Sequence, residues 1–270
     1  MSVASHRVDA IGASHRVVTG NARIVCLVPS ITELLFDLGL GDQIVGRTGF
    51  CFYPKAKVRK VPKIGGTKDF DLEKIRRLEP THLVVNVDEN PRERVTSAKA
   101  FVSNVIVTHP LGPLDNVALF RLLGAIFRRE REAEELVTRF ESAYGEAIIA
   151  TQHLARERVL YVIWKQPWMT ISPDTYIAQT LAAIGWDQVE VGGPARYPEV
   201  ELASLMGSVD RVLLSSEPYA FRPRNVAEVE AMMTNSSRPA VCLIDAEMTS
   251  WYGSRAIAGM KYLAHLRSGC

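Results

Sequence analysis

Residues 23–39 read RIVCLVPSITELLFDLG and contain the pattern that decides the fold. A short run rich in β-branched residues ends at Pro29, a helical pattern follows it, and that pattern stops at Gly39. We expect Ser30 to cap the helix, with Glu33 three residues later completing a capping box. The stretch therefore predicts a strand, a tight turn and a helix, the repeating unit of an α/β sheet.

The same alternation continues along most of the chain, so that helices separate short apolar strands in both halves. Alternation of this kind predicts parallel sheets covered by helices. In the first half we expect strands at 43–47, 81–86 and 104–108 and helices at 71–78 and 94–100. In the second half we expect strands at 159–164, 211–215 and 240–245 and helices at 176–184, 201–206, 226–234 and 254–266.

A long helical pattern without proline separates the two halves, at residues 114–158. The charged cluster at 128–132 within it is interpreted as a solvated face or as the junction of two helices. The predicted fold class is α/β, with two Rossmann-like lobes of mainly parallel sheet joined by a long backbone helix. A helical joint is stiffer than loops, so large hinge closure is not expected. The predicted boundaries are an N-terminal extension at 1–21, a first lobe at 22–112, the linking helix at 113–158 and a second lobe at 159–270.

Charge and hydropathy exclude several classes of protein. The 32 basic and 30 acidic residues give a net charge of +2, so neither nucleic acid nor an anionic membrane is indicated as a partner. No apolar run approaches the ~20 residues that a membrane span requires. His6, Arg7 and Asp9 interrupt any apolar core of an export signal in the first residues, so we expect no signal there. The repeat of ASHRV at 4–8 and 13–17 is interpreted as a flexible or edge-pairing extension.

No sequence motif points to a resident metal or a catalytic group. The four cysteines are scattered without metal-binding spacing, and Cys26 and Cys242 lie in apolar runs where we expect small buried side chains. The segment 65–69 lacks the spacing of a phosphate-binding loop and is interpreted as a turn. His82 is interpreted as a packed strand residue. Acidic side chains near helix starts, such as Glu89, are most simply ordinary helix-start acids, whose charge the helix dipole tolerates.

Two tryptophans lie among turn-forming residues. Trp168 follows Pro167, and Trp251 precedes Gly253, so both are expected on loops at the ends of core strands. For either tryptophan alone, packing is the favoured interpretation. Neighbouring charged residues, including Arg255, shift the balance toward an aromatic pocket with polar groups around it.

Residues 22–270 resemble the substrate-binding proteins of ATP-binding-cassette importers for vitamin B12 and iron chelates. The stretches that carry the resemblance are 23–34, 61–67 and 78–84, while 167–169 and 250–255 look closest to the cobalamin-binding branch. The resemblance implies binding rather than catalysis, with an ABC permease and its ATPase as partners. It also implies a corrinoid such as cobalamin as transported ligand and no intrinsic cofactor. We expect the protein to be a monomer.

In this family, aromatic residues from both lobes surround the corrinoid, and one acidic residue on each lobe docks on permease arginines. The resemblance implies that Glu93 and Glu201 dock on the permease. The aromatic that family members place after the third strand is replaced here around 87–89, which makes the first lobe more acidic. The ligand-contacting positions carried over from the resemblance are Tyr53, Trp168, Tyr197, Trp251, Arg255, Glu247 and Glu217.

Two alternatives remain open on sequence alone. The first is a binding protein for an iron siderophore, haem or another metal chelate. The second is a cytoplasmic α/β enzyme, motivated by the missing export signal and by the Asp88–Glu89 pair, and it ranks lower because no nucleophile, metal or phosphate motif supports it. The resemblance implies the periplasm, whereas the lack of a recognisable signal in this sequence leaves the cytoplasm possible, so the compartment stays open.

Overall fold

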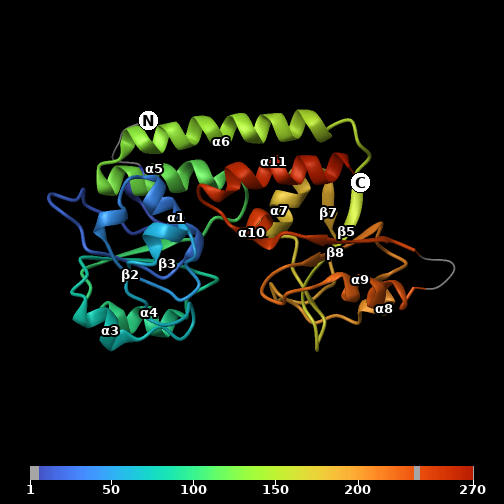
Figure 1. Cartoon of the computed structure of the whole chain (residues 1–270), viewed down its shortest axis with the longest axis horizontal. Helices are drawn as coiled ribbons and strands as arrows, with labels where there is room; N and C mark the ends of the chain where they lie inside the picture. The colour runs from blue at the N-terminus through green and yellow to red at the C-terminus, as the bar shows by residue number, and fades with distance from the viewer. Residues whose placement is uncertain (1–5, 234–237, 270) are drawn as a thin grey trace. The chain divides into compact units, whose positions relative to one another are not determined.

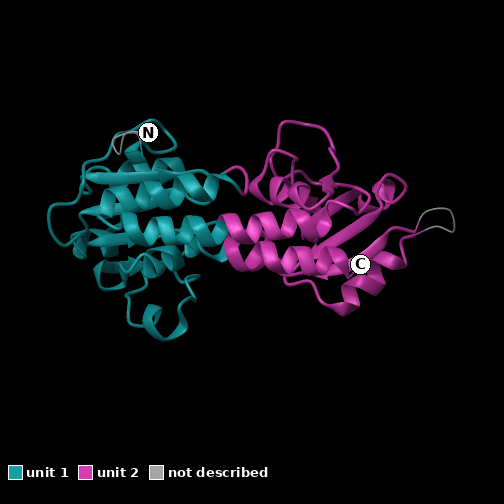
Figure 2. Ribbon diagram, turned by 90° about the horizontal axis from the view of Figure 1, so that it is seen from above, with its two compact units in different colours: residues 1–110, 114–140, 252–255 teal, residues 111–113, 141–251, 256–270 magenta. Residues whose placement is uncertain are grey.

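The computed structural model describes residues 6–233 and 238–269 and divides into two compact units, shown in different colours in Figure 2. Unit 1 comprises residues 1–110, 114–140 and 252–255, and unit 2 comprises residues 111–113, 141–251 and 256–270. Unit 1 is therefore discontinuous in sequence, because the tetrapeptide Tyr252–Arg255 joins it from the far end of the chain.

Unit 1 contains a four-stranded sheet with the strand order β2-β1-β3-β4, in which all neighbours are parallel (Figure 1). Ile24 pairs with His82, and His82 pairs with Asn104, so β1, β3 and β4 are aligned from their first residues. The four strands expected in this half of the sequence are confirmed. They are β1 (Ile24–Cys26), β2 (Ile44–Arg47), β3 (His82–Asn86) and β4 (Asn104–Thr108).

Both faces of this sheet are buried, as a parallel sheet requires. On one face, Val25 and Leu83 pack in a cluster with Ile75 of α3 (Leu72–Arg77) and Val95 of α4 (Arg92–Ala98). The alternate strand residues, such as Val84, are also fully buried. Three further elements of this part of the chain are α1 (Pro29–Asp37), η2 (Gly41–Gln43) and α2 (Lys55–Val58).

The start of α1 differs from the sequence-based expectation. Ser30 does not cap this helix, because the helix already begins at Pro29 and its N-cap residue is Val28, which offers no side-chain acceptor. Proline fits the first helical position because its missing N–H would have no partner there. The expected capping box is therefore wrong, and the carboxylate of Glu33 is used elsewhere. The C-terminal stop is confirmed, since Gly39 adopts a φ of 73°.

The central helical region consists of two helices rather than one. α5 (Asp115–Phe127) ends at Arg128, whose φ of 57° turns the chain before α6 (Glu130–Thr151) begins. The linking helical region expected at 113–158 thus consists of two helices, and of the two interpretations of 128–132 the junction is the one observed. The first part of α6, up to Phe140, belongs to unit 1, and the rest of the helix belongs to unit 2.

A glycine allows the two helices to approach at this junction. A Cβ atom added to Gly124 would lie 2.6 Å from the Cβ of Ala133. The rings of Phe120 and Phe140 also meet edge to face, with centroids 6.3 Å apart. No proline and no glycine stands at the break itself, because Arg128 takes the left-handed conformation that glycine favours. The sequence therefore offered a junction at 128–132 only as one of two interpretations.

Unit 2 contains a sheet with the order β6-β5-β8-β9, and β7 pairs with β5. All pairings are parallel except that of β6, which returns antiparallel to β5. β5, β8 and β9 were expected, whereas β6 and β7 are too short to give a sequence pattern. The strands are β5 (Glu157–Trp164), β6 (Met169–Thr170), β7 (Trp186–Gln188), β8 (Arg211–Ser215) and β9 (Ala240–Ile244).

The helices of unit 2 cover its sheet. Leu160 of β5 and Val212 of β8 pack in one cluster with Leu202 and Val229 of the helices α8 and α9. The sequence did not indicate α10, which has five residues. The helices are α7 (Tyr176–Ala183), α8 (Leu202–Leu205), α9 (Pro223–Glu230), α10 (Ala246–Ser250) and α11 (Arg255–Ser268).

The N-terminal segment lies along the edge strand β4 of unit 1. The backbone N–H of Ala10 donates to the carbonyl of Val107 over 3.0 Å, and the N–H of Val107 donates to the carboxylate of Asp9 over 3.1 Å. Val8 and Ser14, from the two copies of the repeat, form an antiparallel bridge. Of the two interpretations of this repeat, these contacts match edge pairing.

Two further expectations concern single residues. His82 is buried and packs edge-on against Phe127, with centroids 5.1 Å apart, and burial lowers its pKa to about 4. Cys26 is fully buried as expected, whereas Cys242 is only half-buried. Cys270 lies outside the described residues. Within the described part of the chain, no helix combines the length and the apolar character needed to span a membrane.

Candidate functional site

The residues expected to bind ligand lie at the carboxyl ends of the parallel strands in each unit. Ligands of open α/β sheets bind at this edge, because the loops there leave the sheet core. In unit 1, Tyr53 follows β2 and the acidic pair Asp88–Glu89 follows β3. In unit 2, Trp168 follows β5, Tyr197 follows β7, Glu217 follows β8, and Glu247 and Trp251 follow β9.

Arg255 is the centre of the polar contacts in unit 1. Its Nη2 and Nε atoms lie 2.7 and 2.9 Å from the two carboxylate oxygens of Glu33, so the ion pair is bidentate. Its guanidinium carbon also lies 4.0 Å from the ring centroid of Tyr53, within the range of a cation–π contact. Both ionic side chains are mostly buried. Tyr53 and Arg255, which were predicted separately from the sequence, are thus brought together, and Glu33 holds the arginine in place.

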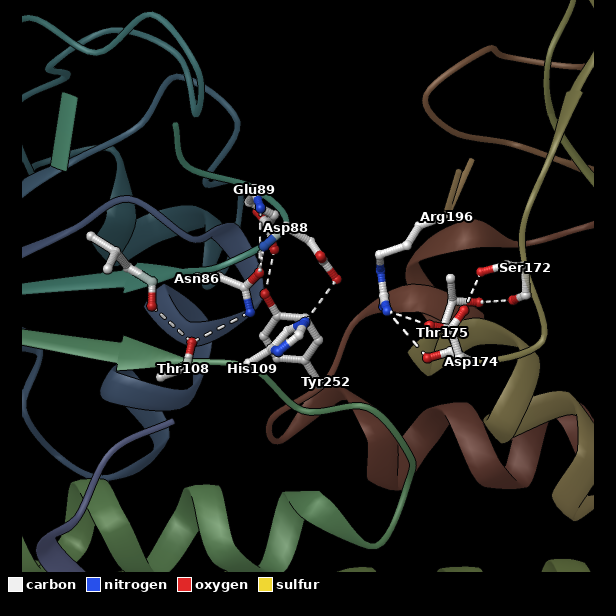
Figure 3. Close-up of polar contacts among 11 residues, drawn as sticks. Asn86, Asp88, Glu89, Thr108, His109, Ser172, Asp174, Thr175, Arg196 and Tyr252 are labelled. Atoms are coloured by element: carbon white, nitrogen blue, oxygen red, sulfur yellow. Dashed lines mark hydrogen bonds and ion pairs between the residues drawn. The ribbon is translucent and has the colours of Figure 1, made fainter. Parts of the chain in front are cut away.

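Tyr252 is a residue that sequence reasoning passed over, although it stands next to Trp251. Its hydroxyl donates a hydrogen bond to the carboxylate of Glu89, and it is buried (Figure 3). The neighbouring Gly253 N–H donates to Asn116 Oδ1 over 2.6 Å. Together with Arg255, these contacts fix the tetrapeptide Tyr252–Arg255 in unit 1.

The pKa of Glu89, at the carboxyl edge of unit 1, is raised from its ordinary value. Burial raises its pKa to about 7, the hydrogen bond from Tyr252 opposes this rise, and the negative charge of Asp88 adds to it. The pKa of Tyr252 is in turn raised well above its usual range, first by burial and then by Glu89. Glu89 therefore changes charge near neutral pH.

Further polar contacts fix the loops after β3 and β4. His109 Nε2 lies 3.4 Å from Asp88 Oδ2, and Asn86 Oδ1 accepts from the backbone N–H of Asp88 over 2.8 Å (Figure 3). The hydroxyl of Thr108 donates to the carbonyl of Val85 over 2.9 Å. The carboxyl edge of unit 1 is thus rich in charge-bearing groups held by neighbours.

In unit 2, three sequence-predicted residues lie together at the ends of β8 and β9. Burial is the first cause that raises the pKa of Glu217, and the charge of Glu247 raises it further, whereas a hydrogen bond involving Trp251 opposes the rise. These interactions bring Glu217, Glu247 and Trp251 into one group. An indole beside two carboxyl groups can offer both a flat apolar face and hydrogen-bond acceptors.

Trp168 is half-buried and packs against the core of unit 2. Its ring stacks on that of Phe221 with an interplanar angle of 3° and centroids 6.0 Å apart. The ammonium of Lys165 also lies 5.7 Å from its ring centroid. These contacts agree with the packing favoured for this tryptophan taken alone, and part of the ring stays accessible.

The loop around Tyr197 is held by its neighbours. Tyr197 is 38% exposed, and the preceding Arg196 places Nη1 2.9 Å from Asp174 Oδ2 (Figure 3). The Ser172 N–H donates to the Arg196 carbonyl over 2.8 Å, and the Ser172 hydroxyl donates to Asp174. The aromatic ring is therefore presented from an anchored backbone.

The two acidic residues expected to dock on a permease are both exposed. Glu93 lies in the first turn of α4 in unit 1, and Glu201 is the residue that precedes α8 in unit 2, where its side chain makes no capping bond. Carboxylates at helix starts are compatible with the helix dipole and remain available to a partner.

Sequence reasoning missed Trp164 and Tyr219. Trp164 ends β5 and was named only as the last position of the predicted strand 159–164, yet it is 39% exposed. Its ring lies edge-on to that of Tyr219, with centroids 5.7 Å apart. The only signal was its place at the last position of a strand, where the core ends.

The described residues provide no group of three metal-binding side chains of the His, Cys, Asp or Glu type. A cavity of about 330 Å³ lies in unit 1 against the N-terminal segment, the end of β4 and α5. It is lined in part by Asp9, His109 and Asp115, and none of the sequence-predicted ligand residues borders it. The candidate site is therefore assigned to the strand ends and not to this cavity.

Comparisons with known proteins agree with this architecture. Residues 24–193 match the family model described as periplasmic binding protein. The vitamin B12-binding protein of Pectobacterium carotovorum is 23% identical over 238 residues, which cover 87% of this chain and 84% of that protein.

Two solved structures share the fold. The apo periplasmic heme-binding protein RhuT from Roseiflexus has a TM-score of 0.79 at 19% identity, covering 93% of this chain and 99% of that one. The periplasmic vitamin B12-binding protein BtuF of Vibrio cholerae has a TM-score of 0.77 at 14% identity, covering 91% and 96%. Members of the matched family are substrate-binding transport proteins rather than enzymes. Because the family model spans more than half of the sequence, the chain belongs to the periplasmic binding protein family.

Proposed function

We propose that this protein is the substrate-binding component of an ABC importer for a corrinoid of the cobalamin type, which it delivers to a permease and its ATPase. The family supports the transport role. The curated relative from Pectobacterium, described as a vitamin B12-binding protein, supports the ligand class. The residues proposed to contact the ligand follow the carboxyl ends of the parallel strands.

The observation that carries the choice of ligand is the group Glu217, Glu247 and Trp251 in unit 2. A corrinoid has neutral amide side chains around a conjugated ring, so its N–H groups can donate to carboxylates while the ring meets an indole. Haem carries propionates, which two neighbouring glutamates would repel. The acidic character of this edge therefore favours an amide-bearing macrocycle.

The contacts of unit 1 complement this proposal. Arg255 can donate to amide carbonyls, and its bidentate pair with Glu33 removes its net charge. Tyr53 adds aromatic surface beside it, although one face of its ring is covered by the guanidinium. Tyr197 would add aromatic surface from unit 2.

The test is a titration of purified protein with cyanocobalamin, haemin and a ferric siderophore, followed by absorbance and by tryptophan fluorescence. We expect saturable binding of cyanocobalamin that is at least about tenfold tighter than that of haemin. The double variant Glu217→Gln with Glu247→Gln should reduce the difference in affinity between cyanocobalamin and haemin, because it removes the repulsion of the haem propionates. Absence of cyanocobalamin binding would refute the corrinoid assignment.

Haem is the second candidate ligand. The likeness in fold to the heme-binding protein RhuT supports it. This alternative gains if haemin binds more tightly than cyanocobalamin in the same titration. Binding of the siderophore alone would favour an iron-chelate importer.

We further propose that Glu93 and Glu201 dock on permease arginines, one from each unit. Their exposure and their places at helix starts support this role. Complementary charge of this kind mainly sets the orientation and the rate of association. Charge reversal at either position should slow association with the permease and leave ligand affinity unchanged.

A further inference from the structure

The tryptophans of this chain differ widely in exposure. Trp186 is fully buried, Trp168 and Trp251 are half-buried, and Trp164 is 39% exposed. Trp164 is nevertheless the last residue of β5, whose preceding residues include the fully buried Val162. Packing does not require so large an apolar ring to remain open to solvent at the end of a core strand.

Trp164 is the exposed end of a continuous row of aromatic rings. It meets Tyr219 edge-on at 5.7 Å between centroids, and Tyr219 is tilted against Phe221 at 4.6 Å. Phe221, which is almost completely buried, stacks on Trp168. The row thus runs from the half-buried Trp168 past the buried Phe221 to the exposed indole of Trp164.

The backbone around Trp164 is held firmly. The N–H of Tyr219 donates to the carbonyl of Ile163 over 3.3 Å, which joins the loop after β8 to the end of β5. Trp164 itself is paired with Met169 of β6. The next residue, Lys165, forms an ion pair of 2.6 Å with Glu228 of α9. A ring presented from such a backbone loses little conformational entropy when it binds a ligand.

The position of Trp164 links it to the proposed site. β5 and β8 are adjacent parallel strands (Figure 1), so their carboxyl ends lie at the same edge of the sheet. Trp164 ends β5, and the loop after β8 carries both Glu217 and Tyr219. The exposed indole therefore lies at the edge that the proposed function assigns to the ligand.

We propose that Trp164, supported by Tyr219, is the stacking surface of unit 2 for the flat conjugated face of a macrocyclic ligand, and that Trp168 supports this surface from within. The inference rests on the proposed function in taking a planar macrocycle as the transported ligand. The inference assigns the contact with the macrocycle to Trp164 instead of Trp168, because the ring of Trp168 already contacts Phe221 and Lys165. Stacking on an indole gains affinity through rigid contact area.

The experiment compares Trp164→Ala and Trp164→Phe with the wild-type protein in titrations with cyanocobalamin and with haemin. We expect Trp164→Ala to weaken binding of the preferred macrocycle by about tenfold and Trp164→Phe to weaken it by less than about threefold. Ile149→Ala, which truncates an exposed apolar residue on α6, is the matched control and should bind like the wild type. Circular dichroism and the midpoint of thermal unfolding check that each variant is folded.

The outcomes separate this inference from the proposed function. If cyanocobalamin binds the wild type and Trp164→Ala equally well, the inference is wrong and the corrinoid function stands. If only haemin binds, and Trp164→Ala weakens it, the corrinoid assignment is wrong and the stacking role stands. Binding of neither macrocycle by the wild type would overturn both.

Discussion

The carboxyl edges of the two sheets occupy equivalent places in their units but differ in chemistry. In unit 1 the edge is organised by charge, through the bidentate pair of Arg255 with Glu33 and the contact of Glu89 with Tyr252. In unit 2 the acidic pair Glu217 and Glu247 lies beside a row of rings that ends at Trp164, and rings of this row pack against the core of the unit. Unit 1 should therefore respond to pH and to the loss of single charges, whereas unit 2 should respond to the loss of aromatic area.

The largest effect is expected for Arg255→Ala. This change leaves the mostly buried carboxylate of Glu33 without its guanidinium and removes the cation from the ring of Tyr53. We expect the free energy of unfolding to fall by about 4 kcal/mol, measured by urea denaturation. The double variant Arg255→Met with Glu33→Leu should be less destabilised than Arg255→Ala. Equal losses would show that the charge pair does not organise this edge.

The next effect is a pH dependence that arises from Glu89, whose pKa rises to about 7 from an ordinary value of 4.5. Between these values the unfolded chain loses the proton first, so stability present below pH 4.5 is lost as the pH rises through 7. Glu89→Gln keeps an acceptor for Tyr252 and should remove this loss, so it should stabilise the protein by about 3 kcal/mol at pH 8. Thermal unfolding from pH 5 to pH 8 measures the difference.

Glu93, which is exposed and follows Glu89 closely in the sequence, provides the matched control. Glu93→Gln should leave the pH profile of the wild type unchanged, because this side chain is exposed in the first turn of α4. A profile of Glu89→Gln that is parallel to that of the wild type would contradict the assignment of the titration to Glu89.

A smaller loss is expected in unit 2 for Trp168→Ala. The ring packs on Phe221 and against the core, so its removal should cost about 2 kcal/mol, less than for a fully buried tryptophan. Trp164→Ala should cost less than about 1 kcal/mol, because the side chain is partly exposed. Urea denaturation of both variants measures this contrast. Similar losses would mean that Trp164 and Trp168 contribute equally to the free energy of unfolding.

Gly253→Ala should cost about 1 kcal/mol. The residue has a φ of 85°, and an added Cβ would lie 3.4 Å from both Leu34 Cβ and the carbonyl oxygen of Ser30. Gly20 has nothing within 4 Å of a built Cβ, so Gly20→Ala should have almost no effect on the thermal midpoint. Tolerance of alanine at 253 would show that the tetrapeptide is not held by its backbone conformation.

The smallest effect on stability is expected for Glu93→Lys and Glu201→Lys. Both side chains are exposed, so each change should alter the free energy of unfolding by less than about 0.5 kcal/mol. Their effect should appear in the rate of association with permease-containing membranes, measured by surface plasmon resonance. An unchanged association rate at low ionic strength would contradict the proposed docking role of Glu93 and Glu201.

Sequence patterns predicted the α/β class and the longer strands because alternation between apolar strands and amphipathic helices depends on local periodicity. β5 and β8 were recognised in this way, whereas the three-residue β7 gave no periodic signal. The break between α5 and α6 was left open because Arg128 adopts a left-handed conformation without a glycine. Tertiary contacts, not local preference, determine that turn.

The candidate site was only partly accessible from sequence. Tyr53 and Arg255 were named separately, but their contact across some 200 positions depends on the fold. Glu33 was assigned to a helix cap because its spacing fits a capping box, and the ion pair with Arg255 could not be read from that spacing. Trp164 was hidden by its place in a strand, because exposure at a strand end is a property of the loops around it.

The membership of Tyr252–Arg255 in unit 1 has a consequence for how the chain is made. A ribosome delivers residues 1–140 long before this tetrapeptide, so the newly made unit 1 lacks the guanidinium that Glu33 meets and the N–H that Asn116 accepts. Domains generally fold as units during synthesis. For this protein, the first unit to emerge is completed only after almost all of the second has been translated.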